Sequence, residues 1–229
     1  MNALTVIVGG LIGIGIRGGI AERFKSIIEH GLALCVLVIG ISGAIKTNDM
    51  MGLVVSTVLG CVVGEAIGID KGLNRLGDWA QSKFSKSGGS FSQGFVSATL
   101  LFCVGAMAVV GSLEAGLSGN GDTLMAKAAL DGVAAAVFAS TLGIGVIFSV
   151  IPLTIYQGGI AILAVWVAPF VSDALINEVS AVGSVMIIAL AVNMLGVLNA
   201  GRIRVANMLP SMLIVLAYRP VIDFFSSLF

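Results

Sequence analysis

The sequence predicts an all-α integral membrane protein, and three observations support this fold class. The 229-residue chain is 58% hydrophobic and only 10% charged, with a mean hydropathy of +1.10. A soluble domain of this length has too small a core to bury so much apolar surface. The apolar residues also fall in runs of about 17–25 residues, the length that crosses a bilayer as a helix.

Eight such runs are expected to form one transmembrane domain over residues 1–229. No basic residue precedes the first run and Arg17 follows it, so the pattern favours a retained span over a signal peptide. The expected spans cover residues 3–20, 28–46, 50–69, 93–112, 126–148, 151–171, 179–200 and 205–225.

Charge asymmetry gives an expected orientation. If Met1 is external, the loops and flanks after the odd-numbered spans hold nine Lys or Arg residues, and the opposite side holds three. Cytoplasmic loops of membrane proteins are enriched in Lys and Arg. We therefore expect both termini to be external.

A polar insert of about residues 71–90 separates the third and fourth expected spans. It places Leu73, Leu76 and Phe84 on one helical face, and Arg75 and Lys83 lie away from that face. This pattern is typical of a short amphipathic helix on the cytoplasmic leaflet.

Aliphatic-glycine pairs on the odd-numbered spans suggest an internal repeat. Four parallel two-helix hairpins would place the odd spans in an inner ring, but close packing of membrane helices also produces such small-residue patterns. The pairs are Ile12-Gly13, Leu59-Gly60, Leu142-Gly143 and Leu195-Gly196.

Asp131 is the strongest candidate for a functional residue. It lies about five residues inside the fifth expected span, among small residues, where a carboxylate could bind a cation or carry a proton. The alternative is an interfacial ion pair with Lys127, four residues earlier on the same helical face. Glu65 is a weaker candidate for a functional residue, because it lies near the cytoplasmic end of its span and its carboxylate could reach the membrane interface.

Neutral polar residues on the odd-numbered spans form a second group of candidates. Hydroxyl and amide groups can replace part of the hydration shell of an ion or hold a small solute, although bonds between helices explain the same residues. Gln157 joins this group because a helix break near Pro152 would expose carbonyl groups to a cavity; Pro152 could equally mark the start of a helix. The odd-span candidates are Thr57, Ser140, Thr141, Asn193 and Asn199.

Other functional classes have little support. The chain has one histidine, His30, and lacks the HExxH, GxSxG and CxxC patterns of common catalytic or metal sites. We therefore expect no enzyme activity, no cofactor and no bound metal. The net charge of zero gives no basic surface for nucleic acid.

Several stretches resemble the YdfK/YqgA-like family of uncharacterised bacterial inner-membrane proteins. The resemblance covers nearly the whole chain and implies a multi-spanning protein of the bacterial inner membrane, but it transfers no functional residues. The stretches that carry it are GISGAIKT (40–47), GFVSATLLFCVGAMAVVGSLEAGLSG (94–119), KAALDG (127–132), FASTLGIGVIFS (138–149), YQG (156–158) and NMLG (193–196).

The sequence therefore predicts a channel or transporter for a small ion or solute, with a pathway lined by the odd-numbered spans. The chain is short for a transporter, so a homo-oligomer in the lipid bilayer is expected. The alternative is a membrane subunit or scaffold that transports nothing and acts through partner proteins.

Overall fold

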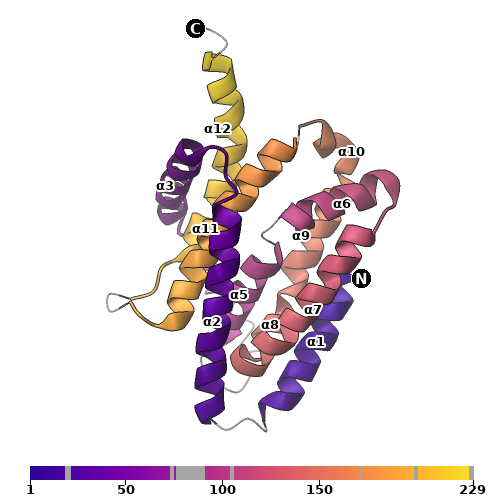
Figure 1. Ribbon diagram of the computed structural model, residues 1–229, viewed down its shortest axis with the longest axis vertical. Helices are drawn as coiled ribbons and strands as arrows, with labels where there is room; N and C mark the ends of the chain where they lie inside the picture. Colours follow the sequence, from indigo (N-terminus) through magenta and orange to yellow (C-terminus); the bar gives the residue numbers. More distant parts are fainter. Residues whose placement is uncertain are drawn as a thin grey trace. The chain divides into compact units, whose positions relative to one another are not determined.

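The protein is an all-α membrane protein, as predicted. The computed structural model describes residues 1–18, 22–72, 75, 91–103, 106–170, 172–198 and 201–226, and all regular secondary structure in these residues is helical. The expected amphipathic helix at 71–90 falls outside the described residues, apart from residues 71, 72 and 75. Figure 1 shows the helices in chain order.

The helix bounds show where the expected spans begin and end. The helices are α1 (Asn2–Arg17), α2 (Glu22–Ala44), α3 (Met50–Ile67), α5 (Phe91–Cys103), α6 (Ala106–Ser118), α7 (Asp122–Leu142), α8 (Gly145–Phe148), α9 (Val150–Ile162), α10 (Ala164–Val167), η1 (Ala168–Phe170), α11 (Asp173–Leu195), η2 (Val205–Met208) and α12 (Pro210–Ser226).

Fewer helices than the expected eight are long enough to cross a bilayer on their own. Among the described residues, five pass by length and composition, and the bent pair α5–α6 makes a sixth if it is one span. Two shorter apolar helices, Asn2–Arg17 and Val205–Tyr218, occupy the first and last expected runs.

Large apolar side chains lie on the outer surface of these helices. Ile155, Ile162 and Trp166 are 70%, 81% and 78% exposed, and α3 exposes Val54, Val58 and others along its length. Water would not tolerate so many exposed apolar side chains, whereas lipid does. This surface and the long apolar helices together identify a membrane protein.

The chain forms two compact units, each built from segments far apart in sequence. Unit 1 comprises Met1–Ala33 and Leu73–Phe170, and unit 2 comprises Leu34–Gly72 and Val171–Phe229. Helix α2 contributes its first half to unit 1 and its second half to unit 2.

In unit 1, α1 and α7 run side by side in the same direction (Figure 1). A Cβ atom at Gly9 would lie 2.0 Å from the carbonyl oxygen of Gly132, and one at Gly13 would lie 2.2 Å from that of Ala136. Four residues along one helix thus match four along the other. Glycine allows the two backbones to approach closely, as in other small-residue contacts between membrane helices.

The bent pair α5–α6 crosses the full thickness of unit 1. Gly94 of α5 lies against Leu142, the last residue of α7, and Gly111 of α6 lies against Leu124 near the start of α7. The pair therefore runs the length of α7 in the opposite direction, with a 60° bend at its break. This arrangement is that of a single span with a break in it.

Helix α7 ends earlier than the sequence predicted. Gly143 adopts a φ of +80°, and α8 begins at Gly145, so the polypeptide turns where the fifth expected span, 126–148, was to continue. An L side chain rarely adopts such a φ, so glycine permits this turn. The span moves by several residues toward the N-terminus, which changes the depth of Asp131.

Unit 2 uses the same kind of close contact between helices. A Cβ atom at Gly64 of α3 would lie 1.8 Å from the carbonyl oxygen of Asn207, and one at Gly40 of α2 would lie 3.0 Å from that of Ser184 on α11. These contacts hold α3 against the segment that leads into α12, and α2 against α11.

The four glycines of the suggested repeat have two different roles. Gly13 and Gly60 are buried inside helices at close contacts, whereas Gly143 and Gly196 end α7 and α11 with positive φ. The four positions are therefore not equivalent in local structure.

Candidate functional site

A cluster of four polar side chains lies buried in unit 1. Lys127 Nζ donates a hydrogen bond to Asp131 Oδ2 at 2.6 Å, and Asn2 Nδ2 donates to the same oxygen at 2.8 Å. Asn2 Nδ2 also donates to Gln157 Oε1 at 3.2 Å. We call Asn2, Lys127, Asp131 and Gln157 the polar cluster; all four are less than 10% exposed. They come from α1, α7 and α9, which the fold brings together.

Asp131 lies at the middle of α7 and not near its end. The helix runs from Asp122 to Leu142, so nine helical residues precede Asp131 and eleven follow it. At 1.5 Å per residue, α7 is about 31 Å long, close to the thickness of the hydrocarbon core. Charged side chains within membrane-spanning helices are rare and mark a functional site or a firm partner.

The ion pair bears on the two interpretations of Asp131, a functional carboxylate or a partner of Lys127. The residue does bind Lys127, its neighbour four positions earlier, and the two side chains of the pair are 7% and 9% exposed. Burying a pair of charges contributes little net stability, since desolvation offsets the attraction. The pair therefore calls for a reason other than stability.

The two amide groups of the cluster have unused hydrogen-bonding capacity. Because the Asp131 carboxylate can only accept, Asn2 must direct its Nδ2 toward Asp131. The same Nδ2 donates to Gln157, so Gln157 must direct its Oε1 toward Asn2. Asn2 Oδ1 and Gln157 Nε2 are then buried without a hydrogen-bond partner among the residues that the structure describes. An unpaired buried polar atom costs about 1–3 kcal/mol, so a bound molecule that pairs with both atoms would be stabilised.

Helix α5 ends close to the polar cluster. Its last residue, Cys103, lies near Lys127 and Asp131 of α7 and near Tyr156 of α9. Broken membrane helices frequently form solute sites in transporters, because a break frees backbone groups at membrane depth. The cluster thus combines buried charge, unpaired amides and a broken span.

Ser140 and Thr141 lie at the other end of α7. Their hydroxyl groups donate to the carbonyl oxygens of Val137 and Phe138, at 2.7 and 3.1 Å. They occupy the last turn before Gly143, so the structure does not bring them together with Asp131. The expected group of pathway residues on this helix is divided between its middle and its end.

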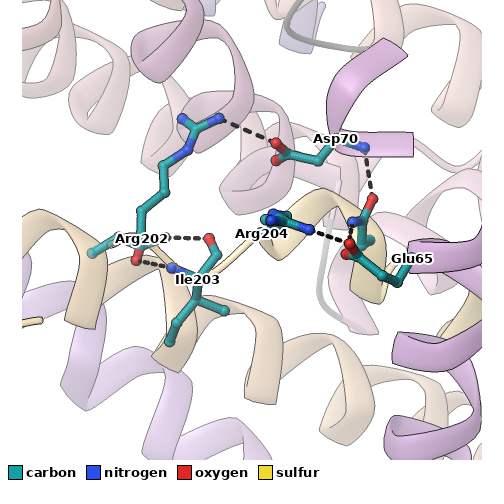
Figure 2. A network of polar contacts seen from close by, with 7 residues as sticks. Glu65, Asp70, Arg202, Ile203 and Arg204 are labelled. Atoms are coloured by element: carbon teal, nitrogen blue, oxygen red, sulfur yellow. Dashed lines mark hydrogen bonds and ion pairs between the residues drawn. The ribbon is translucent and has the colours of Figure 1, made fainter. Parts of the chain in front are cut away.

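Glu65 belongs to a polar network in unit 2 (Figure 2). It forms an ion pair with Arg204 and accepts from Asn207 Nδ2 at 2.6 Å. Asn207 Oδ1 accepts from the backbone N–H of Asp70 at 2.7 Å, and Arg202 pairs with the Asp70 carboxylate at 3.2 Å. The network links the end of α3 to the segment between α11 and α12.

Asn193 uses both ends of its amide on one backbone residue. Its Nδ2 donates to the carbonyl oxygen of Ile203 at 2.8 Å, and its Oδ1 accepts from the N–H of Ile203 at 2.7 Å. This pair of bonds joins the end of α11 to the returning chain, as Figure 2 shows at Ile203. Asn193 was an expected pathway residue, and here it holds a loop.

The two remaining pathway candidates, Thr57 and Asn199, give little support for a binding site. The Thr57 hydroxyl has no partner, while the Thr57 carbonyl accepts from Ser211 Oγ at 3.3 Å. A helical hydroxyl can rotate to the carbonyl three or four residues earlier, so an unpaired hydroxyl is weaker support for a ligand than an unpaired amide. Asn199 lies outside the described residues.

The site contains residues that sequence reasoning did not select. Asn2 precedes the first expected span and gave no signal, and Lys127 was considered only as an interfacial partner of Asp131.

Glu178 of unit 2 is a buried carboxylate outside the polar cluster, and the sequence analysis did not select it. It is 2% exposed and accepts from the Thr47 hydroxyl at 2.5 Å and the Asn48 N–H at 2.8 Å. It stood one residue outside the expected span 179–200, whereas α11 already begins at Asp173.

Neither an open groove nor a metal cluster competes with the polar cluster. A groove of about 400 Å³ between α1 and α7 has an almost wholly apolar lining that includes Leu4, Val8 and Val133, which suits lipid chains better than a polar solute. Within the described residues, no group of three or more His, Cys, Asp or Glu side chains could hold a metal ion.

The fold and the site define a class: a multi-spanning helical membrane protein with a buried, charge-paired polar cluster beside a broken span. The chain belongs to the family described as "Protein of unknown function (DUF554)", which matches residues 1–219. This result confirms the resemblance found in the sequence.

Two relatives match over most of their length. The "Uncharacterized membrane protein YdfK" of Bacillus subtilis (strain 168) is 30% identical over 217 residues, 93% of this chain and 91% of that protein. The "Uncharacterized protein YqgA" of Escherichia coli (strain K12) is 31% identical over 221 residues, 94% of this chain and 93% of that protein. No solved structure matches the chain.

Proposed function

We propose that the protein transports a small ion or solute across the membrane and that the polar cluster is its binding site. One observation carries the proposal: a buried Lys127–Asp131 pair at the middle of a membrane helix, joined to two amides that each retain an unpaired atom. Such a cluster is costly to bury and contributes little to stability. A binding function accounts for its presence.

The proposal includes an orientation and a set of partners. Arg17 lies against Gly143, at the end of unit 1 where α7 terminates. The excess of Lys and Arg on that side makes it cytoplasmic, with both termini external, in the inner membrane of a bacterium. The protein acts without enzymatic chemistry, in the lipid bilayer and as a homo-oligomer.

The first test is uptake by the purified protein in proteoliposomes, with Asp131→Asn compared with the wild type. The substitution leaves Lys127 without its counter-charge, so we expect uptake to fall by about tenfold or more. Asp122→Asn is the matched control, because Asp122 is exposed at the start of the same helix. It should transport like the wild type.

The outcome separates transport from the alternative role. Uptake that Asp131→Asn leaves unchanged would remove the polar cluster from the pathway. Folded wild-type protein that transports no member of a broad panel of ions and small metabolites would contradict transport and favour a subunit that acts through partner proteins.

A further inference from the structure

We infer that the solute is a small polar molecule of zero net charge that carries both a hydrogen-bond donor and an acceptor. This inference rests on the proposed function and narrows its substrate class. It follows from the charge balance and the unpaired atoms of the polar cluster.

The ion pair disfavours simple ions as ligands. A cation would have to displace Lys127, whose ammonium nitrogen already lies 2.6 Å from Asp131 Oδ2 and repels other cations. An anion attracted to Lys127 would meet the carboxylate of Asp131 at the same place. A molecule of zero net charge can bind without disturbing this balance.

The unpaired atoms specify one acceptor and one donor on the protein. Asn2 Oδ1 can accept a hydrogen bond, and Gln157 Nε2 can donate. Lys127 has donors to spare, since its ammonium can donate three hydrogen bonds and donates one within the described residues, to Asp131. An uncharged amide, or an amino acid zwitterion, offers the complementary groups.

The contact between the two amides is the natural point of entry. Its length of 3.2 Å exceeds the 2.8 and 2.6 Å of the bonds to Asp131, so it is the weakest of the three. It also joins α1 to α9, whereas the strong Lys127–Asp131 pair lies within α7. A solute that inserts between Asn2 and Gln157 would replace one long bond with at least two new ones.

The test is a transport panel in proteoliposomes that contain the full-length wild-type protein. The neutral probes are urea, acetamide and glycerol, the zwitterions are glycine and alanine, and the ions are Na⁺, K⁺, H⁺ and Cl⁻. We expect uptake of at least one probe of zero net charge above empty liposomes, and no ion flux above that background.

Side-chain variants then connect the result to the unpaired donor. Gln157→Leu removes it and should lower uptake of the transported probe by about tenfold or more. Gln93→Leu is the matched control, because Gln93 is exposed at the start of α5, and it should leave uptake unchanged. Each variant is first shown to be folded by its elution from a sizing column; if Gln157→Leu is not folded, Gln157→Met, which keeps the size and has no donor, replaces it.

Failure of the inference differs from failure of the proposed function. Ion flux without uptake of any neutral or zwitterionic probe would overturn the inference and preserve transport. Uptake of a neutral probe that neither Gln157 variant alters would overturn the assignment to these amides. Absence of any flux would overturn both.

Discussion

The two units of the molecule both bury polar side chains, but they use them differently. In unit 2, Asn193 spends its donor and its acceptor on Ile203, and Glu178 accepts from Thr47 and Asn48. In unit 1, Asn2 and Gln157 are 5% and 8% exposed, and each has an amide atom without a partner among the described residues.

The difference distinguishes a scaffold from a binding site. Buried polar groups are normally paired, so a saturated amide needs no explanation beyond the loop it holds. An unsaturated one beside a buried ion pair has a cost of about 1–3 kcal/mol that the fold does not recover. We interpret the saturated contacts of unit 2 as scaffold and the polar cluster of unit 1 as the site.

The largest expected effect is on the buried ion pair. Lys127→Met leaves the Asp131 carboxylate without its counter-charge and should destabilise the protein by about 3–5 kcal/mol. The double variant Lys127→Met/Asp131→Leu removes both charges and should recover most of that stability, because apolar residues often replace a buried pair at little cost. Thermal unfolding in detergent measures both.

Uptake by the double variant completes this test. If the pair serves transport, the stable double variant should transport at background level. A double variant that is both stable and active would show that transport does not need the ion pair. It would contradict the assignment of the binding site to unit 1.

A smaller effect, on stability alone, is expected at Asn193. Asn193→Leu leaves the backbone N–H of Ile203 without its partner and removes one of the two bonds to its carbonyl, which still accepts from the Val205 N–H. We expect a loss of about 1–3 kcal/mol in the free energy of unfolding. Uptake per folded molecule should match the wild type. Normal stability combined with lost uptake would move the pathway into unit 2.

At Glu178, the expected loss is smaller still. Glu178→Gln keeps the size and one acceptor but weakens the bonds to Thr47 and Asn48, since hydrogen bonds to a carboxylate are about twice as strong as neutral ones. We expect a loss of about 1 kcal/mol in the free energy of unfolding and unchanged uptake. A strong fall in uptake at normal stability would make Glu178 a second functional carboxylate.

The smallest effect is expected at Glu65. Its side chain is 52% exposed and that of its partner Arg204 is 53% exposed, and ion pairs at such positions contribute at most about 1 kcal/mol. Glu65→Gln should therefore change the unfolding temperature and the uptake very little. A clear loss of uptake would restore Glu65 to the pathway that the sequence suggested.

Composition and hydropathy were sufficient to predict the fold class. Asp131 and Gln157, which the sequence offered as pathway candidates, are both buried in the structure. Hydropathy could not locate the end of α7, because Gly143 lies inside an unbroken apolar run and only its positive φ ends the helix. The sequence therefore placed Asp131 closer to the start of its helix than the structure does.

The composition of the site depended on contacts that no local pattern records. Asn2 meets Asp131 across 129 positions and Gln157 across 155. Asn193 looked like a pathway residue because an amide in an apolar segment must be satisfied, but its partner is a loop residue ten positions later. Sequence identified which groups need partners, and only the tertiary structure could provide them.

The most direct test of the contrast is equilibrium binding of the transported probe, radiolabelled, to detergent-purified protein. Wild type, Gln157→Leu and Asn193→Leu are compared at equal amounts of folded protein. We predict that the wild type and Asn193→Leu bind with the same affinity and that Gln157→Leu binds at least about tenfold more weakly. Equal affinity for the wild type and Gln157→Leu, or a loss of binding only in Asn193→Leu, would contradict the assignment of the site to unit 1.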